Sequence, residues 1–363
     1  MTTSVPEDLK TPYVFLGRSG LKVSNICLGT GTFGESRTGR PGQTDEQASH
    51  ELINRFVEWG GNFLDTADIY GSGLSETIVG KWLETQHRDK FVIGTKVRGN
   101  MGTQENVNNV GLSRRHITKS IDRSLQRLHT DFVDLYQAHQ FDPATPLEET
   151  FRTFDDLVRG GKVRYIGVSN FNGWQMERVV NTARTLGINP IISLQQQYSL
   201  VCRESEFEAF QVCKSAGIGV LPYSPLKWGL LAGKVKRGVQ PSDGRLGWAA
   251  QQGGRGNQFT DKTFDIVEAA ETIAKTRGRT TAQVSLRWLL QRDVVSSVII
   301  GATKLAQLDD NMAANGWSLT PEEMKQLDDV SAPVTTYPYD RQRLNGDRFN
   351  PAIKDSHVKS TST

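Results

Sequence analysis

The feature that most constrains the fold of this chain is an alternation of strand-like and helix-like segments that repeats eight times. Short apolar runs alternate with longer segments whose apolar residues recur at helical spacing. The strand-like runs are NICLG (25–29), NFLDTAD (62–68), FVIGTKV (91–97), FVDLYQAH (132–139), VRYIGVSN (163–170), IISLQQQY (191–198), IGVLPYS (218–224) and SSVIIGA (296–302). Because no segment between them resembles a linker, the pattern predicts one α/β domain, a (β/α)8 TIM barrel. A doubly wound sheet is the alternative, but it usually has fewer strands before a domain break.

Segments outside the repeat predict additions to the barrel, and residues 225–260, after the seventh strand-like run, are predicted to form a long loop. The apolar runs of YVFLGRSGLKVSN (13–25) predict an N-terminal β-hairpin that closes the bottom of the barrel, and TPEEMKQLDDV (320–330) predicts an added C-terminal helix. Thr145-Pro-Leu-Glu148 and Thr320-Pro-Glu-Glu323 both have the spacing of a helix capping box. We expect a single domain over 1–363, with a flexible N-terminus at 1–12 and a C-terminal loop and disordered tail at 332–363.

Composition and charge exclude several classes of protein. The 363 residues are 37% hydrophobic and 23% charged, and the net charge is only +3, so no nucleic-acid partner is expected. Cys27, Cys202 and Cys213 are far apart, and their spacing predicts neither a disulfide framework nor a metal site. The chain has no apolar run of 18 residues and a polar N-terminus. We therefore expect a cytoplasmic protein with no membrane span and no bound metal.

Four reactive side chains lie at or just after the ends of three consecutive strands. Asp65 ends the second strand and Tyr70 follows it, whereas Lys96 and His139 end the third and fourth. Each has an ordinary structural explanation alone, such as turn capping, a counter-ion or aromatic packing. A lysine and a carboxylate inside an apolar barrel are costly unless they are paired, however, and the carboxyl ends of barrel strands form active sites. The four residues are therefore predicted to form one catalytic cluster.

At this point the chain resembles the aldo-keto reductase superfamily, including bacterial-type reductases and potassium-channel β subunits. The matching stretches span residues 14 to 330 in the family's order: NFLDTADIYG, GTKV, SLQRLHTDFVDLYQAHQFD, GKVRYIGVSNF, LQQQYSL, LPYSPL and VIIGATKLAQLDDN. The resemblance implies a (β/α)8 fold and an NADP-dependent oxidoreductase that reduces an aldehyde or ketone to an alcohol. It also implies that Asp65, Tyr70, Lys96 and His139 are the catalytic tetrad.

The chemistry implied by the resemblance gives each tetrad residue a role. Tyr70 would donate a proton to the carbonyl oxygen as general acid, helped by the positive charge of Lys96, because a free tyrosine is a poor acid near neutral pH. Asp65 would keep Lys96 charged and in place. His139 would orient the carbonyl and share in proton relay. Members of the family that reduce carbon–carbon double bonds tend to have glutamate there, so His139 favours carbonyl reduction.

The resemblance also implies an NADP(H) site along the strand ends and the following loops. Ser169, Asn170 and Gln195 would hold the nicotinamide carboxamide, and Tyr223 would stack on the ring. Thr303 and Lys304, at a helix N-terminus, would bind the 2′-phosphate, and because no acid is in place to hold a bare ribose, NADPH is favoured over NADH. The other cofactor-binding residues implied are Gly29, Thr30, Ser224, Leu226, Gly229, Lys234, Arg245, Gly301, Gln307 and Asn311.

Gly29-x-Gly31-x-x-Gly34 matches the dinucleotide fingerprint of a doubly wound sheet, but its context does not fit. The third glycine enters a loop rather than a helix, and the next strand-end carboxylate, Asp65, is more than 30 residues further on. We interpret the stretch as the loop after the first barrel strand. There, the backbone of Gly29 and Thr30 would approach the nicotinamide ring closely.

The sequence does not identify the substrate, and two functions other than carbonyl reduction have to be considered. Phe33 and Trp228 are candidate substrate-binding residues, but the loops that set substrate identity do not reveal which carbonyl compound is reduced. A nucleotide-binding regulatory subunit would keep the same tetrad. A lyase with Lys96 as Schiff-base nucleophile is disfavoured, because pairing with Asp65 keeps Lys96 protonated.

Overall fold

The predicted strands form one parallel sheet that curls into a barrel. The computed structural model describes residues 5, 10–34, 41–102, 104–239, 244–251 and 259–340. Within these ranges the sheet has eight strands in the order β10-β3-β4-β5-β6-β7-β8-β9, and every neighbouring pair is parallel. They are β3 (Ile26–Gly29), β4 (Phe63–Asp65), β5 (Val92–Val97), β6 (Val133–Ala138), β7 (Val163–Ser169), β8 (Ile191–Gln197), β9 (Gly219–Tyr223) and β10 (Val298–Ile300). A parallel bridge between Val220 and Val295 nearly closes the barrel beside β10.

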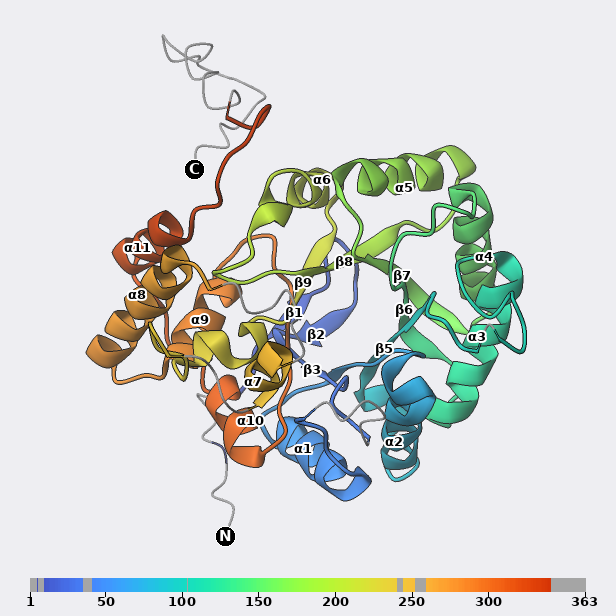
Figure 1. Cartoon of the computed structure of the whole chain (residues 1–363). Coiled ribbons are helices and arrows are strands. Elements are labelled where there is room, and N and C mark those ends of the chain that lie inside the picture. Colours follow the sequence, from blue (N-terminus) through green and yellow to red (C-terminus); the bar gives the residue numbers. More distant parts are fainter. Residues whose placement is uncertain are drawn as a thin grey trace. The chain divides into compact units, whose positions relative to one another are not determined.

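Helices surround the strands (Figure 1), as the periodicity predicts. Those that follow the strands in sequence are α1 (Glu46–Glu58), α2 (Leu74–Leu83), α3 (Arg114–Leu128), α4 (Leu147–Arg159), α5 (Gly173–Leu186), α6 (Ala209–Ala216), α8 (Asp261–Arg277), α9 (Thr281–Leu290) and α10 (Leu305–Met312). The added helix predicted near the C-terminus is α11 (Pro321–Ser331). These elements confirm a (β/α)8 TIM barrel.

Two local predictions were wrong. The glycine-rich stretch after β9, predicted as loop, contains helix α7 (Gly244–Gln251). Thr145 does not cap α4, because Pro146 occupies the N-cap position and the Thr145 hydroxyl donates instead to Asp142 Oδ2 at 2.7 Å. At α11 the capping box is confirmed, since the amide of Glu323 donates to Thr320 Oγ1 at 3.2 Å and the amide of Thr320 donates to the Glu323 carboxylate at 2.8 Å.

The predicted hairpin is present as β1 (Tyr13–Phe15) and β2 (Lys22–Ser24), paired antiparallel. Its side chains Leu16 and Val23 are fully buried and pack with a set of apolar residues from the barrel strands. That set is Cys27, Phe63, Val92, Leu135, Ile192, Leu221 and Ile299. The hairpin thus fills the N-terminal end of the barrel with apolar side chains, and the polar residues lie toward the other end.

The described part of the C-terminal region, residues 332–340, belongs to a second unit that is separate from Met1–Ser331 by its contacts. A turn closes within it, where the amide of Tyr339 donates to the carbonyl oxygen of Thr336 at 2.8 Å. The predictions for residues 1–4, 6–9 and 341–363, and for most of the loop 34–43, lie outside the described residues.

Candidate active site

The alternation of side chains along a strand explains why polar groups meet at the mouth of the barrel. Phe63 and Leu135 point into the apolar layer, so the residues two positions further, Asp65 and Gln137, point inward one layer higher. Lys96 pairs in register with Gln137 on the neighbouring strand. Gln195 on β8 joins the same layer, where its amide donates to Asp65 Oδ1 at 2.9 Å.

Lys96 is held between a carboxylate and a phenol. Its Nζ donates to Asp65 Oδ2 at 2.5 Å, to the carbonyl oxygen of Thr66 at 2.8 Å and to the Tyr70 hydroxyl at 3.3 Å. The side chain of Lys96 is 0% exposed and that of Asp65 is 2% exposed. A buried ammonium needs all of its protons bonded, and here each of the three has an acceptor. The three residues thus form one continuous network.

Charge and burial act in opposite directions on Lys96 and Tyr70. Burial alone would lower the pKa of Lys96, but Asp65 and Tyr70 more than offset it and hold that pKa above its usual value. Burial raises the pKa of Tyr70, and the charge of Lys96 opposes this shift without cancelling it. Lys96 therefore stays charged and Tyr70 stays protonated near neutral pH, which is the state that a proton donor needs.

His139 lies beside Tyr70 in a setting that keeps its ring neutral. The two rings meet edge to face with centroids 5.8 Å apart. Burial, followed by the charges of Lys96 and Arg98, lowers the pKa of His139 to about 3. The imidazole is therefore neutral at neutral pH, with one ring nitrogen that can donate a hydrogen bond and one that can accept.

Gln137 is a member of the network that the sequence analysis missed. Its amide donates to Asp65 Oδ1 at 3.1 Å, on the same oxygen that accepts from Gln195. A Cβ at Gly167 would lie 3.1 Å from Gln137 Cγ and 2.3 Å from Ser193 Oγ, so a glycine there makes room for the amide. Its position two residues before His139 on one strand is the signal that could have placed it inside the barrel.

Three of the residues predicted to hold the nicotinamide, Ser169, Asn170 and Tyr223, lie together at the ends of β7 and β9. Tyr223 donates from its hydroxyl to Asn170 Oδ1 at 2.8 Å, and Asn170 Nδ2 donates to Ser169 Oγ and to the carbonyl oxygen of His139, both at 3.0 Å. Gln195, predicted to join them, directs its amide toward Asp65 instead. The ring of Tyr223 and the amide of Asn170 are thus tied directly to the backbone of the tetrad.

The residues after β3 that were predicted to contact cofactor or substrate are instead packed or hydrogen-bonded within the protein. Gly29 packs against β10, because a Cβ there would lie 2.7 Å from Ile299 Cγ2. Thr30 is fully buried and its hydroxyl donates to the carbonyl oxygen of Asp65 at 3.1 Å. Phe33 is 1% exposed and lies in the hydrophobic core, whereas its neighbour Thr32 lines the cavity described next.

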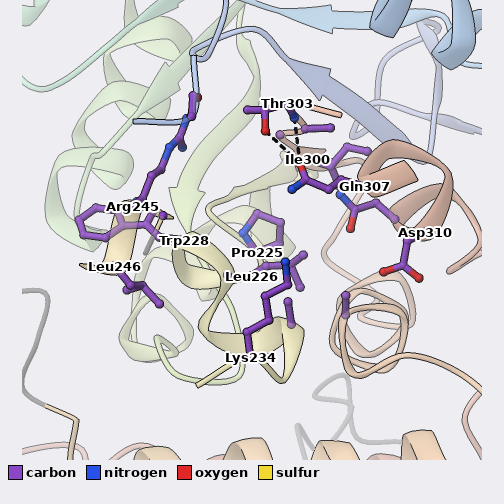
Figure 2. A pocket seen from close by; sticks show the side chains of 18 of the residues that line it. Pro225, Leu226, Trp228, Lys234, Arg245, Leu246, Ile300, Thr303, Gln307 and Asp310 are labelled. Atoms are coloured by element: carbon purple, nitrogen blue, oxygen red, sulfur yellow. Dashed lines mark hydrogen bonds between the residues drawn. The ribbon is translucent and has the colours of Figure 1, made fainter. Parts of the chain in front are cut away.

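A cavity of about 680 Å³ lies between η5 (Lys227–Ala232) with α7 on one side and β10 with α10 on the other. Figure 2 shows Trp228, Lys234 and Arg245 around it, opposite Thr303 and Gln307. The predicted cofactor or substrate residues that line it are Leu226, Trp228, Gly229, Lys234, Arg245, Gly301, Thr303, Gln307 and Asn311. Ser224 and Lys304 are not among the lining residues.

The walls of this cavity fit a dinucleotide. A Cβ built at Gly229 or Gly301 would meet no atom within 4 Å, so the backbone faces open space at both places. Cationic side chains at Lys234 and Arg245 lie near one side, and both the amide and the hydroxyl of Thr303 donate to Gln307 Oε1 at 3.0 and 3.1 Å. Open backbone and cations suit phosphate groups, and amide side chains suit a base.

One premise of the cofactor prediction was wrong, because an acid does line this end of the cavity. Asp310 on α10 faces it, next to Gln307 (Figure 2). Its Oδ1 accepts from Thr280 Oγ1 at 3.0 Å and from Gln283 Nε2 at 2.8 Å, so it also ties α10 to α9. The preference for NADPH therefore cannot rest on the absence of an acid.

The described part of the chain lacks two further features, a metal-binding cluster and a membrane-spanning helix. In those residues no group of three or more histidine, cysteine, aspartate or glutamate side chains is arranged to hold a metal ion. Over the same ranges, every helix is too short or too polar to span a membrane.

The mouth of the barrel holds a buried lysine, its carboxylate partner, a tyrosine and a histidine, and a separate cavity lies between η5, α7, β10 and α10. This combination suits an oxidoreductase. The model of the aldo/keto reductase family matches residues 25–332, and the chain belongs to that family. This membership supports carbonyl reduction with a nicotinamide cofactor.

Individual relatives agree with this assignment over nearly their whole lengths. The chain is 35% identical to the uncharacterized oxidoreductase YrpG of Bacillus subtilis, over 88% of this chain and 95% of the relative. It is 34% identical to versiconal hemiacetal acetate reductase of Aspergillus parasiticus, over 91% and 99%. It is also 35% identical to a putative voltage-gated potassium channel subunit beta of Schizosaccharomyces pombe, over 88% and 93%.

Proposed function

We propose that this chain is an NADPH-dependent reductase that converts an aldehyde or ketone to an alcohol. The observation that supports this best is the position of the Lys96 ammonium, which is buried and bonded at once to Asp65 and to the Tyr70 hydroxyl. Such a lysine is not a nucleophile, since its pKa is raised above the usual value. It is instead a fixed positive charge placed next to a phenol.

The proposed chemistry assigns one task to each residue. A bound nicotinamide cofactor supplies the hydride. Tyr70 donates its proton to the carbonyl oxygen as negative charge grows there, and Lys96 stabilises the phenolate that remains. Asp65, held by Gln137 and Gln195, keeps Lys96 charged and in place. His139, neutral at physiological pH, donates a hydrogen bond to the carbonyl oxygen and orients it.

The cavity and the strand ends are the proposed cofactor site. Asn170, Ser169 and Tyr223 adjoin the backbone of His139 and would hold the nicotinamide end, with Ser224 next to them. Lys234 and Arg245 would hold the pyrophosphate and Thr303 with Gln307 the adenosine end. Lys304 occupies the N-cap position of α10 without a side-chain capping bond and is exposed, so its side chain can extend toward a 2′-phosphate at that end. The proposed preference for NADPH over NADH rests on this position of Lys304. The cytoplasmic location of the protein stays a prediction.

A regulatory subunit is the second candidate, favoured by the similarity to the Schizosaccharomyces pombe relative, whose name is that of a channel subunit. Steady-state oxidation of NADPH by the purified chain, with a panel of aldehydes and ketones, separates the two. A reductase turns over repeatedly with at least one carbonyl class. Tight NADP(H) binding without turnover on any of them would contradict the proposed function and favour the regulatory role.

A further inference from the structure

Three barrel strands are each followed by a residue other than glycine whose φ is positive. The residue directly after β5, β7 and β9 has a positive φ: Arg98 at 137°, Asn170 at 59° and Ser224 at 52°. A residue other than glycine has a higher conformational energy at a positive φ. Such residues occur where the surrounding structure enforces the conformation, often at functional sites. Asn170 and Ser224 lie in the proposed cofactor site, whereas Arg98 has no assigned role. Its φ is also the furthest from the left-handed region that non-glycine residues tolerate.

The backbone around Arg98 places it between two members of the tetrad. The amide of His139 donates to the carbonyl oxygen of Val97 at 2.9 Å, so the strand carrying His139 runs beside the start of Arg98. On the other side, a Cβ at Gly99 would lie 2.7 Å from Ile69 Cδ1, and Ile69 directly precedes Tyr70. The amide of Gly111 donates to the carbonyl oxygen of Arg98 at 3.0 Å and fixes the loop in this position.

The guanidinium of Arg98 has unused donors. Its Nε is buried and has no hydrogen-bond partner. Across the part of the chain that the structure describes, the Arg98 side chain forms no hydrogen bond or ion pair. A buried N–H of an arginine without an acceptor is costly, and an exception of this kind often marks a binding function.

The Asp142 carboxylate, on which the charge of Arg98 acts, has other hydrogen-bond partners. Its oxygens accept from the amides of Leu112 and Ala144 at 2.8 and 3.0 Å and from the Thr145 hydroxyl at 2.7 Å. Burial raises the pKa of Asp142, and these hydrogen bonds, with a smaller contribution from the charge of Arg98, bring it below the usual value. Arg98 also contributes to the lowered pKa of His139. The charge of Arg98 therefore acts on both Asp142 and His139, and Arg98 forms a direct ion pair with neither of them.

We infer that Arg98 is a substrate-binding residue that selects carbonyl compounds with an anionic oxygen, a carboxylate or a phenolate, near the reacting carbonyl. The backbone of Arg98 lies between the strand that carries His139 and the residue before Tyr70, and the charge of Arg98 acts on His139, so the residue lies close to where we propose that the carbonyl is reduced. A planar guanidinium suits a carboxylate, because two N–H groups can bond its two oxygens. This inference rests on the proposed function and names the substrate class of the same site.

The test compares one aldehyde in charged and neutral form. The probes are 4-carboxybenzaldehyde and its methyl ester, reduced by the wild type, by Arg98→Gln and by the control Arg152→Gln, which removes an arginine from the exposed side of α4. We expect Arg98→Gln to lower kcat/KM for the acid about tenfold or more, the effect of one charge-assisted hydrogen bond, and to leave the ester unchanged. Equal loss on both probes, or the same loss in Arg152→Gln, would overturn the inference.

A second variant separates binding from folding. Glycine adopts a φ of 137° without strain, so Arg98→Gly should unfold at the same or a higher temperature than the wild type while losing the selectivity for the acid. Calorimetric titration of benzoate into the protein with NADP+ gives a readout without turnover, with benzamide as the neutral control. Benzoate affinity that is unchanged in Arg98→Gly would count against Arg98.

Failure of this inference differs from failure of the proposed function. If the wild type reduces neither probe nor any other carbonyl compound, the proposed reductase activity is wrong. If the wild type reduces both but Arg98→Gln treats acid and ester as the wild type does, only the role of Arg98 is wrong.

Discussion

Lys96 Nζ and Asp65 Oδ2 lie 2.5 Å apart in a layer of the barrel that is almost fully shielded from water. Such a pair is costly to bury and costly to break, because removing one partner leaves the other charge without compensation. The pair lies next to the Tyr70 phenol, where we propose that the charge assists proton transfer. The pair therefore makes predictions for stability as well as for activity.

Replacing Asp65 by asparagine leaves the ammonium of Lys96 buried without its counter-ion. We expect the free energy of unfolding to fall by about 3–5 kcal/mol in Asp65→Asn, measured by urea denaturation. The double variant Asp65→Asn/Lys96→Met should be less destabilised than the sum of its single variants, since neither charge remains. Strict additivity of the two effects would show that the pair is not coupled.

The neutral state of His139 predicts how stability changes with pH. Its pKa is about 3 in the folded chain, against 6.5 for the ordinary side chain. Between these values the unfolded chain binds more protons, so stability contributed by neutral His139 is present above pH 6.5 and is lost as the pH falls toward 3. We expect the free energy of unfolding to fall more steeply in the wild type than in His139→Gln, by at most about 1.4 kcal/mol per pH unit. Parallel curves in this window would contradict the burial of a neutral imidazole.

Gly301 offers a test of the cavity that avoids the catalytic residues. A Cβ at Gly301 meets nothing within 4 Å and points to space that we assign to the cofactor, so Gly301→Val should fold normally and bind NADPH at least about tenfold more weakly. Gly20 is the matched control, because a Cβ there also meets nothing, but it lies in the turn of the hairpin. Fluorescence titration of NADPH measures both. Equal affinity in Gly301→Val and Gly20→Val would place the nucleotide elsewhere.

We predict that Lys304 sets the preference between NADPH and NADH. Lys304→Ala should weaken NADPH binding about tenfold, the loss of one charge-assisted hydrogen bond, and leave NADH unchanged. Lys325→Ala, which removes an exposed lysine from α11, should change neither. If NADPH and NADH weaken by the same factor in Lys304→Ala, the residue does not contact the 2′-phosphate.

Much of the barrel could be predicted from sequence because strand and helix periods differ and alternate without interruption. The tetrad followed, since residues that end consecutive parallel strands must meet at one mouth. Asp65, Lys96 and Tyr70 do form one network there. Their chemical roles were not derivable from periodicity and came from the resemblance to the family.

Other features depend on tertiary contacts that no local pattern reveals. Gln137 was missed because its spacing from His139 places it inside the barrel but gives a glutamine no role until a carboxylate is placed beside it. Asp310 was missed because the sequence does not show which face of its helix is turned toward the cavity. The hydrogen bond from Thr280, the N-cap residue of α9, fixes that orientation in the structure. The stretch that contains α7 is rich in glycine and therefore has a low intrinsic helix propensity.

The measurement that tests the central claim most directly is reduction of a carbonyl substrate by Tyr70→Phe, with NADPH binding measured on the same preparation. The change removes one oxygen and keeps the ring that packs against His139. We predict that kcat falls at least about 100-fold, the usual contribution of a general acid, while the affinity for NADPH stays within about twofold. Turnover by Tyr70→Phe at the wild-type rate would contradict the assignment of Tyr70 as the proton donor.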